Sequence, residues 1–449
     1  MGIIAPELSQ KLLASIETDR LVIFAGAGLS MAHPSEVPSA AKVAAYTSKK
    51  YSEVTLGDVP AGAGDNLEIL AEFLLANGAL STLFIDRLVE WDAFRRAPNK
   101  GHKAIADFLW CHAIVSAVTT NVDELIELAS SELGGFLRTS LDGAEMSRIW
   151  PHAPFLKVHG CAVRDPNNTL WCKGQLRANP LELCARRVQE STTWLRANLV
   201  GRDLLFVGFW SDWAYLNSVL VDAIDANRFT LVVLVDPENR AKLQQKAPEL
   251  WAWASKQQDF VHAPVSGADF LDELRALFCR SFMNRLLASA TSRWPAWAGI
   301  LGPTQALPET LTTEDLFALR RDSCGKPTRQ VVTEKRPTAA MSTTGVAHLC
   351  FLNKGALVDG ARYTIANKRL RIVNGAGMLL SDVRAAFAQE PPTPQGDDYV
   401  VCAGAEDDGG VPPNVIGRHM TPTVARPGSS AKWMTAVQAL QTDFATETA

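Results

Sequence analysis

Residues Leu21-Val-Ile-Phe-Ala-Gly-Ala-Gly28 join an unbroken apolar run to a turn with two glycines. Strands buried on both faces of a parallel sheet have this continuous apolar character, whereas strands of a one-sided sheet alternate apolar and polar residues. Glycine lets the chain turn sharply and lets a neighbouring backbone or a ligand approach closely. The stretch therefore predicts a central strand of a parallel α/β sheet that ends in a glycine turn.

Five further apolar runs repeat this strand character and alternate with stretches of helical periodicity. The runs are residues 114–121, 155–159, 203–208, 230–236 and 260–263. Residues 65–97 are purely helical in pattern, with Leu67, Leu70 and Leu74 spaced along one helix face. Alternating strands and helices predict a doubly wound, Rossmann-like parallel sheet over residues 1–290, interrupted by a helical insertion.

The character of the sequence changes after residue 290. Prolines and glycines are frequent over residues 291–345, which favours an irregular linker or wrapping segment. Residues 346–449 contain strand candidates at 347–352 and 362–373, and a short helix is expected near 381–389. We therefore expect a small, strand-rich α+β appendage that serves assembly or sensing.

Composition narrows the class of protein. Of 449 residues, 47% are apolar and 20% are charged, which excludes a mostly disordered chain. The net charge of −4 argues against direct nucleic-acid binding. No apolar run reaches the roughly 18–20 residues of a membrane helix, and the first residues lack a signal-peptide pattern. Eight cysteines without a C-x-x-C pair favour reduced thiols, so we expect a cytoplasmic protein.

Polar or glycine-containing turns follow five of the predicted strands. In chain order they are Gly26-Ala27-Gly28-Leu-Ser30, Thr119-Thr120-Asn121-Val-Asp123, His159-Gly160, Gly208-Phe-Trp-Ser211 and Val235-Asp236. Taken singly, each has an ordinary explanation, such as a tight turn, a helix cap or a structural histidine. The carboxyl ends of parallel strands share one edge of a sheet, where open α/β sheets bind ligands. Five such turns favour a binding site, and a glycine turn before a helix suits a phosphate.

The order of these motifs (G-A-G-x-S, T-x-N-x-D, H-G, then two further strand ends) resembles the sirtuin family over about residues 10–290. The resemblance implies that NAD+ binds, with phosphates and the nearby ribose at the first glycine turn and adenosine at the last two. The implied binding residues are Gly26, Ala27, Gly28, Ser30, Thr120, Asp123, Gly208, Ser211 and Asp236. Among them, Asp123 is the residue implied to contact the nicotinamide carboxamide.

Two residues carry the chemistry that the resemblance implies. Asn121 would position the reacting water and the ribose, and His159 would act as general base on a ribose hydroxyl or a water. Histidine suits that task because its ordinary pKa lies near neutral pH.

The sequence also departs from the protein-deacylating sirtuins. Those enzymes insert a zinc ribbon of two C-x-x-C pairs after the H-G motif, whereas Cys161, Cys172 and Cys184 stand singly here. Paired spacing is what a tetrahedral zinc site of this kind needs, so we expect no zinc and place an acyl-lysine substrate in doubt. The G-I-P-x-F-R stretch of the deacylases is missing as well, and Thr120 stands where many have glutamine.

The T-T-N-x-D form and the appended C-terminal domain instead resemble the sirtuin-like NADases of bacterial anti-phage defence. Examples accompany HerA-type ATPases, short Argonautes and the Thoeris system, and the first arrangement suits the length of this chain best. The resemblance implies hydrolysis of NAD+ to nicotinamide and ADP-ribose, gated by assembly into a homo-oligomer or by a HerA-like partner. Two alternatives stay open: a module that binds NAD or ADP-ribose without catalysis, and a lysine deacylase.

Overall fold

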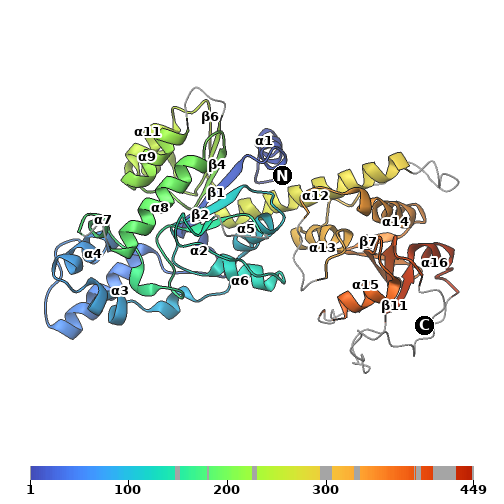
Figure 1. Ribbon diagram of the computed structural model, residues 1–449, viewed down its shortest axis with the longest axis horizontal. Coiled ribbons are helices and arrows are strands. Elements are labelled where there is room, and N and C mark those ends of the chain that lie inside the picture. The colour runs from blue at the N-terminus through green and yellow to red at the C-terminus, as the bar shows by residue number, and fades with distance from the viewer. Residues whose placement is uncertain are drawn as a thin grey trace. The chain divides into compact units, whose positions relative to one another are not determined.

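The computed structural model describes residues 2–146, 152–178, 182–224, 230–293, 306–327, 334–388, 390, 396–407 and 431–446. The chain divides into two compact units, Met1–Leu274 and Arg275–Ala449, and each unit has a sheet of its own (Figure 1). In the described part of the chain, no helix is long and apolar enough to cross a membrane.

Six parallel strands form the sheet of the first unit, in the order β3-β2-β1-β4-β5-β6. Their bounds are β1 Leu21–Ala25, β2 Ser116–Thr119, β3 Phe155–Lys157, β4 Asp203–Val207, β5 Leu231–Val235 and β6 Asp259–Ala263. In register, Phe24 of β1 lies opposite Val118 of β2 and Phe206 of β4. The doubly wound, Rossmann-like sheet is therefore confirmed, and its strand order reverses between β1 and β4, where open sheets of this kind bind ligands.

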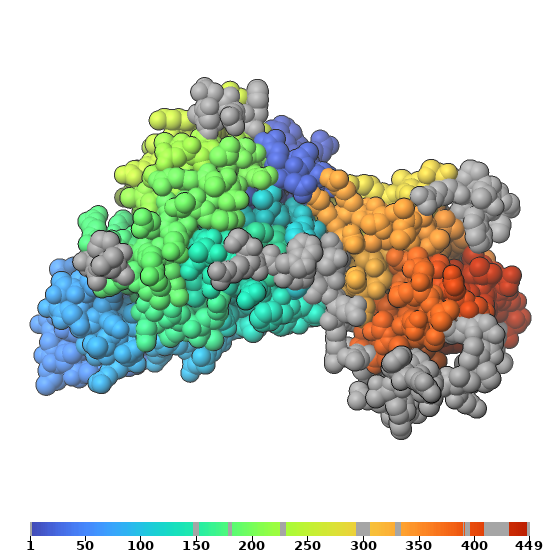
Figure 2. All heavy atoms as spheres, in the orientation of Figure 1, coloured from blue at the N-terminus to red at the C-terminus, as the bar shows by residue number. Residues whose placement is uncertain are grey.

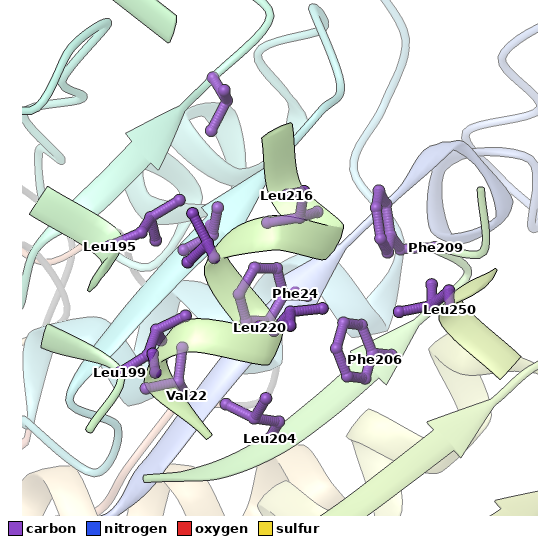
Figure 3. Close-up of a cluster of buried hydrophobic side chains, with 14 of the residues drawn as sticks. Val22, Phe24, Leu195, Leu199, Leu204, Phe206, Phe209, Leu216, Leu220 and Leu250 are labelled. Carbon is purple, nitrogen blue, oxygen red and sulfur yellow. The ribbon is translucent and has the colours of Figure 1, made fainter. Parts of the chain in front are cut away.

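Helices cover both faces of this sheet, which explains why every residue of β1, β4 and β5 is buried. The helices are α1 Pro6–Glu17, α2 Ala27–Ser30, α5 Lys100–Trp110, α6 Leu125–Glu132, α8 Leu183–Asn198, α9 Ala214–Ala223, α10 Arg240–Lys246, α11 Pro248–Ala254 and α12 Gly267–Arg293, which extends past the division between the units. Figure 3 shows one apolar cluster, in which Phe24 and Phe206 of the strands meet Leu195, Leu216 and Leu220 of α8 and α9.

The predicted helical insertion is present, and it starts earlier than expected. It comprises α3 Ala40–Thr55, α4 Leu67–Ala76, the π-helix η1 Leu80–Leu88 and the 3-10 helix η2 Trp91–Phe94. Leu70, Leu74 and Phe84 form an apolar core with Cys172, which lies between the 3-10 helix η4 (Pro166–Asn168) and α7 (Gly174–Ala178). The atoms of the insertion, light blue in Figure 2, gather at one end of the first unit.

The second unit has a mixed five-stranded sheet in the order β11-β10-β9-β8-β7. The strands are β7 Leu357–Asp359, β8 Arg362–Ile365, β9 Lys368–Asn374, β10 Tyr399–Ala403 and β11 Lys432–Thr435, and the helices are α13 Thr313–Ser323, η6 Ala339–Met341, α14 Ser342–Asn353, α15 Leu380–Phe387 and α16 Ala436–Gln441. Strands β9 to β11 are parallel, whereas β7 to β9 are antiparallel. The strand-rich α+β appendage is therefore confirmed.

One strand expected in the appendage is wrong. Residues 347–352 belong to helix α14 and not to a strand. All six are buried, so their sequence shows neither the period of an amphipathic helix nor that of a half-buried strand. Within the predicted linker at 291–345, the structure has helix α13, while residues 294–305 and 328–333 lie outside the described residues. The role of that segment stays a prediction.

Candidate ligand site at the carboxyl edge of the first sheet

The glycine turn after β1 packs directly against the turn after β4. The Gly28 amide donates to the Gly208 carbonyl oxygen at 2.9 Å, and Gly208 has a φ of +58°. A Cβ on Gly208 would lie 2.3 Å from the Leu29 nitrogen, and one on Gly26 would lie 2.6 Å from the Gly208 oxygen. The glycines therefore serve this close approach. The Gly28 N–H is used by Gly208 and is therefore not free for a phosphate, but Ala27 and Gly28 are both exposed, and their role in binding stays a prediction.

Ser30, Asn121 and Asp123 come together where the strand order reverses. The Ser30 hydroxyl donates to Asp123 Oδ2 at 2.9 Å, and Asn121 Nδ2 donates to Ser30 Oγ at 3.0 Å. Asn121 Nδ2 also donates to the Gly26 carbonyl oxygen at 3.1 Å. These contacts fix the side-chain amide and turn its NH2 group inward. Within the described residues the Asn121 carbonyl oxygen has no hydrogen-bond partner, so it can accept one from a bound molecule.

His102 completes this network, and the sequence analysis missed it. Its Nε2 lies 3.2 Å from Ser30 Oγ, and its Nδ1 accepts from the Asn99 amide at 3.1 Å. An accepting Nδ1 leaves the proton on Nε2, which donates to Ser30. Burial lowers the pKa of His102 to about 3, so its ring is neutral at pH 7. Asn99 and His102 form a capping box on α5, and their spacing before a helical run was the available signal.

Asp123 is a buried acid that accepts hydrogen bonds through both its carboxylate and its backbone carbonyl oxygen. Its Oδ1 accepts from the Leu125 amide at 3.2 Å, and Lys157 Nζ donates to its backbone carbonyl oxygen. Burial raises the pKa of Asp123, while the charge of Lys157 acts in the opposite direction. Lys157 is itself fully buried and pairs with Glu127 at 3.2 Å. Asp123 therefore orients Ser30, and its own carboxylate is closed to solvent.

His159 follows β3 and is held by aromatic side chains that the sequence did not indicate. Its Nε2 lies 2.8 Å from the Tyr215 hydroxyl oxygen, and its ring lies 4.5 Å from the Trp213 ring at 67°. Only 6% of His159 is exposed, and burial lowers its pKa to about 3. In the sheet register, Lys157 of β3 lies opposite Thr119 of β2. Asn121 and His159 each come two residues later, so they leave the sheet at the same level. In the described residues no hydrogen bond joins His159 to Asn121.

The remaining predicted residues lie at the ends of their strands as the topology requires. Asp236, after β5, is 6% exposed, and its Oδ1 accepts from the Glu238 amide at 2.9 Å, so its carboxylate shapes a turn. Ser211, after β4, and Thr120, after β2, are half-buried. Thr120 thus lies on the Asn121 side of the switch point, whereas Ser211 and Asp236 lie on the other side.

The three single cysteines that follow the H-G motif, where deacylases have a zinc ribbon, lie in different surroundings. Cys172 is in the apolar core of the helical insertion, and burial raises its pKa to about 11. Cys184 is in the main core of the first unit, and Cys161 Sγ lies 3.6 Å from Lys157 Nζ. Over the described ranges, no group of three or more His, Cys, Asp and Glu side chains is arranged to hold a metal ion.

Comparisons with known proteins give structural likenesses only. No family model matches the chain, and no curated protein matches it either. Solved structures similar to it include a Sir2 homologue mutant in complex with 2'-O-acetyl ADP ribose (15% identity, 60% of this chain and 95% of that chain, TM-score 0.33). Others are a Sir2 homologue–NAD complex (17%, 59% and 91%, 0.33) and Sir2 bound to acetylated peptide (12%, 59% and 96%, 0.31). At these values the likeness does not bear on what this chain does.

Proposed function

We propose that the first unit binds NAD+ and hydrolyses it to nicotinamide and ADP-ribose. The observation that carries the proposal is the hydrogen-bonded group of Ser30, Asn121 and Asp123 at the switch point of a 3-2-1-4-5-6 sheet. These residues belong to the ordered motifs that resemble sirtuins. His159, from the next motif, leaves β3 level with Asn121 on β2.

The chemistry asks little of the protein beyond positioning. The bond between ribose C1' and nicotinamide breaks with its electron pair going to the nicotinamide nitrogen, which leaves an oxocarbenium-like ribose. A water oxygen then bonds to C1' and gives up a proton. The unpaired carbonyl oxygen of Asn121 orients that water or the ribose, and neutral His159 takes the proton. A general base whose pKa is near the working pH contributes about 10²–10⁴ in rate. Burial lowers the pKa of His159 to about 3, which makes it a weaker base than an ordinary histidine, so its contribution should lie at or below the lower end of that range.

Water, and not an acyl-lysine, is the acceptor in this proposal. The helical insertion closes on an apolar core around Cys172, where a deacylase would carry zinc-binding cysteine pairs. From the resemblance we further propose that the reaction depletes NAD+ during phage infection. In that setting a homo-oligomer or a HerA-like ATPase partner would gate it.

The test is chromatography of the full chain with NAD+, with and without an acetyl-lysine peptide. The proposal predicts nicotinamide and ADP-ribose in equal amounts, with no effect of the peptide. Deacetylated peptide with 2'-O-acetyl ADP-ribose would instead establish a deacylase. NAD+ binding without any turnover, alone and with a HerA-like ATPase added, would establish a binding module.

A further inference from the structure

A lysine lies in the interior of the first unit, beside Asp123. Lys157 of β3 is fully buried, and its Nζ lies 3.2 Å from Glu127 Oε1 and 3.6 Å from Cys161 Sγ. Burial by itself lowers the pKa of Lys157, but nearby acids, Glu127 foremost, outweigh burial and raise it. Lys157 is therefore a cation at neutral pH. Because a buried charge is costly unless it is compensated, Lys157 and the acids around it form one electrostatic unit.

Lys157 also connects the segments that follow β2 and β3. These two segments run side by side beyond the ends of their strands, since the Ala162 amide donates to the Val122 carbonyl oxygen at 2.8 Å. From β3, Lys157 Nζ reaches across and donates to the backbone carbonyl oxygen of Asp123. The lysine thus links the strand that leads to His159 with the segment that carries Asp123.

The hydrogen bonds of Asp123 are those of an ionised carboxylate. Its Oδ2 accepts from the Ser30 hydroxyl at 2.9 Å, and its Oδ1 accepts from the Leu125 amide at 3.2 Å. Both oxygens therefore act as acceptors. A proton on Oδ1 would face the Leu125 amide, which is itself a donor. Burial raises the pKa of Asp123 and so opposes ionisation, whereas the charge of Lys157 lowers it.

The contacts of Ser30 show what protonation of Asp123 would change. The Ser30 oxygen accepts from Asn121 Nδ2 at 3.0 Å and from His102 Nε2 at 3.2 Å, and its one proton goes to Asp123. Both lone pairs of the hydroxyl are therefore used. A protonated Asp123 would bring a third donor to this oxygen and displace Asn121 or His102. His102 cannot accept at Nε2 instead, because its Nδ1 already accepts from the Asn99 amide.

The titratable groups packed around Asp123 come from three elements. They are Lys157 of β3 with Cys161 after it, His102 of α5 behind Ser30, and Glu124 and Glu127 at the start of α6. Burial lowers the pKa of His102 to about 3 and raises that of Cys161, so both are neutral at pH 7. Among these groups, Lys157 is therefore the one that supplies positive charge.

We propose that Lys157 is a positioning residue, whose buried charge keeps Asp123 ionised. The ionised Asp123 accepts the hydrogen bond of Ser30, and the Ser30 oxygen then holds the NH2 group of Asn121. This leaves the Asn121 carbonyl oxygen facing a ligand. The inference rests on the proposed function for its effect on turnover, whereas the ionisation of Asp123 can be measured in the protein alone.

The first experiment is carbon-13 NMR of the aspartate carboxyl groups in the full chain, with Asp123→Asn to identify the signal. In the wild type, Asp123 should stay ionised from about pH 8.5 to about pH 6. Lys157→Met should raise the pH at which it titrates by about 1–3 units, because a nearby opposite charge is removed. A wild-type Asp123 that is protonated in that range, or an unchanged titration in Lys157→Met, would overturn the inference.

Two further variants make the comparison clean. Lys157→Met leaves Glu127 buried without its partner, so the change is also made together with Glu127→Gln, and Glu127→Gln alone is the reference. The upward shift of the Asp123 titration should appear in the double variant as well. Lys103→Met removes a cation that pairs with Glu132 at 3.0 Å on the surface of α5 and α6, and it should leave that titration unchanged.

Nicotinamide release gives the second arm. For Lys157→Met the rate should fall about tenfold for each pH unit below the raised pKa of Asp123, and it should recover in alkaline solution. The wild type and Lys103→Met should lack this acid limb. A Lys157→Met profile parallel to that of the wild type would overturn the catalytic part, since lost packing lowers the rate equally at every pH. Absence of release from the wild type would instead count against the proposed function, and the NMR arm would still decide the role of Lys157.

Discussion

Within the described residues, each unit has a hydrogen-bonded tyrosine–histidine pair, and the donor–acceptor distance is 2.8 Å in both. In the second unit, His348 is fully buried and both of its nitrogens are engaged, one by Tyr363 and the other by Ser323. In the first unit, His159 has one nitrogen engaged by Tyr215, and the described residues supply no partner for the other. The histidine of the second unit therefore has hydrogen-bond partners at both nitrogens, whereas that of the first unit has one nitrogen available to a ligand.

A structural hydrogen-bond network and a candidate site differ in whether the protein itself satisfies the polar groups. His348 lies on α14, and both of its ring nitrogens have protein partners, Ser323 of α13 and Tyr363 of β8. His159 instead follows a parallel strand at the carboxyl edge, level with Asn121, whose side-chain oxygen has no hydrogen-bond partner among the described residues. Burial lowers the pKa of both histidines, so a shifted pKa does not separate the two cases. They differ in whether a ring nitrogen lacks a hydrogen-bond partner and in whether the histidine lies at the carboxyl edge of the parallel sheet.

The largest expected effect separates the two histidines by activity. His159→Ala should reduce nicotinamide release from NAD+ by up to about 10², because it removes a base that burial has already weakened. His348→Ala should leave the rate per folded molecule unchanged and should lower the free energy of unfolding, because it empties a fully buried position. Equal losses of activity in the two variants, after correction for folded protein, would remove the distinction drawn here.

A second pair of variants compares two glycines of positive φ in the first unit. Gly208 (φ +58°) is packed against the Gly28–Leu29 backbone, whereas Gly201 (φ +70°) has open space around the position of a Cβ. Gly201→Ala should cost about 1–2 kcal/mol from backbone strain alone. Gly208→Ala should cost at least about 3 kcal/mol, since the turns of β1 and β4 must also separate. Urea unfolding measures both, and equal costs would mean that the packed turns are not under tight constraint.

A third expectation concerns pH and applies to both units. Burial lowers the pKa of His102 and His159 to about 3 and that of His348 to about 4, below the ordinary value of 6.5. Between those values the unfolded chain binds more protons than the folded one, so stability rises with pH. The stabilisation present above pH 6.5 should therefore be lost as pH falls toward 4. Thermal unfolding from pH 7.5 to 4.5 tests this, and His348→Gln should flatten the slope.

The smallest effect concerns Cys172 and tests whether this cysteine binds zinc. Cys172→Ala should cost about 1–2 kcal/mol as a loss of packing in the apolar core of the insertion. A zinc chelator should change neither the melting temperature nor the turnover of the wild type. A fall in melting temperature on chelation, abolished in Cys172→Ala, would point to a metal at that position.

Much of the fold could be predicted from the sequence because buried parallel strands carry an unmistakable pattern. The runs that form β1 and β5 are apolar throughout, β4 is apolar after Asp203, and each of the three is followed by a glycine or polar turn. Residues 347–352 of α14 resemble a strand in sequence because five of the six are apolar, and a short apolar run has no period that separates a buried strand from a buried helix.

The candidate site was predictable only where its residues follow the strands of one sheet edge. Ser30, Asn121 and Asp123 come directly after β1 and β2, so topology alone brings them near. Tyr215 was not predictable, because its contact with His159 depends on how far the segment after β4 extends along that edge. No local pattern encodes such a contact between residues far apart in the chain.

A crystal structure of the full chain with ADP-ribose would show where the ribose lies relative to Asn121 and His159. We expect the ribose next to the leaving-group position to lie within hydrogen-bond distance of the Asn121 side-chain oxygen and of the His159–Tyr215 pair. The diphosphate should lie beside Ala27, and the adenosine should lie toward the ends of β4 and β5. ADP-ribose bound away from this edge, or a ribose that meets neither Asn121 nor His159, would contradict it.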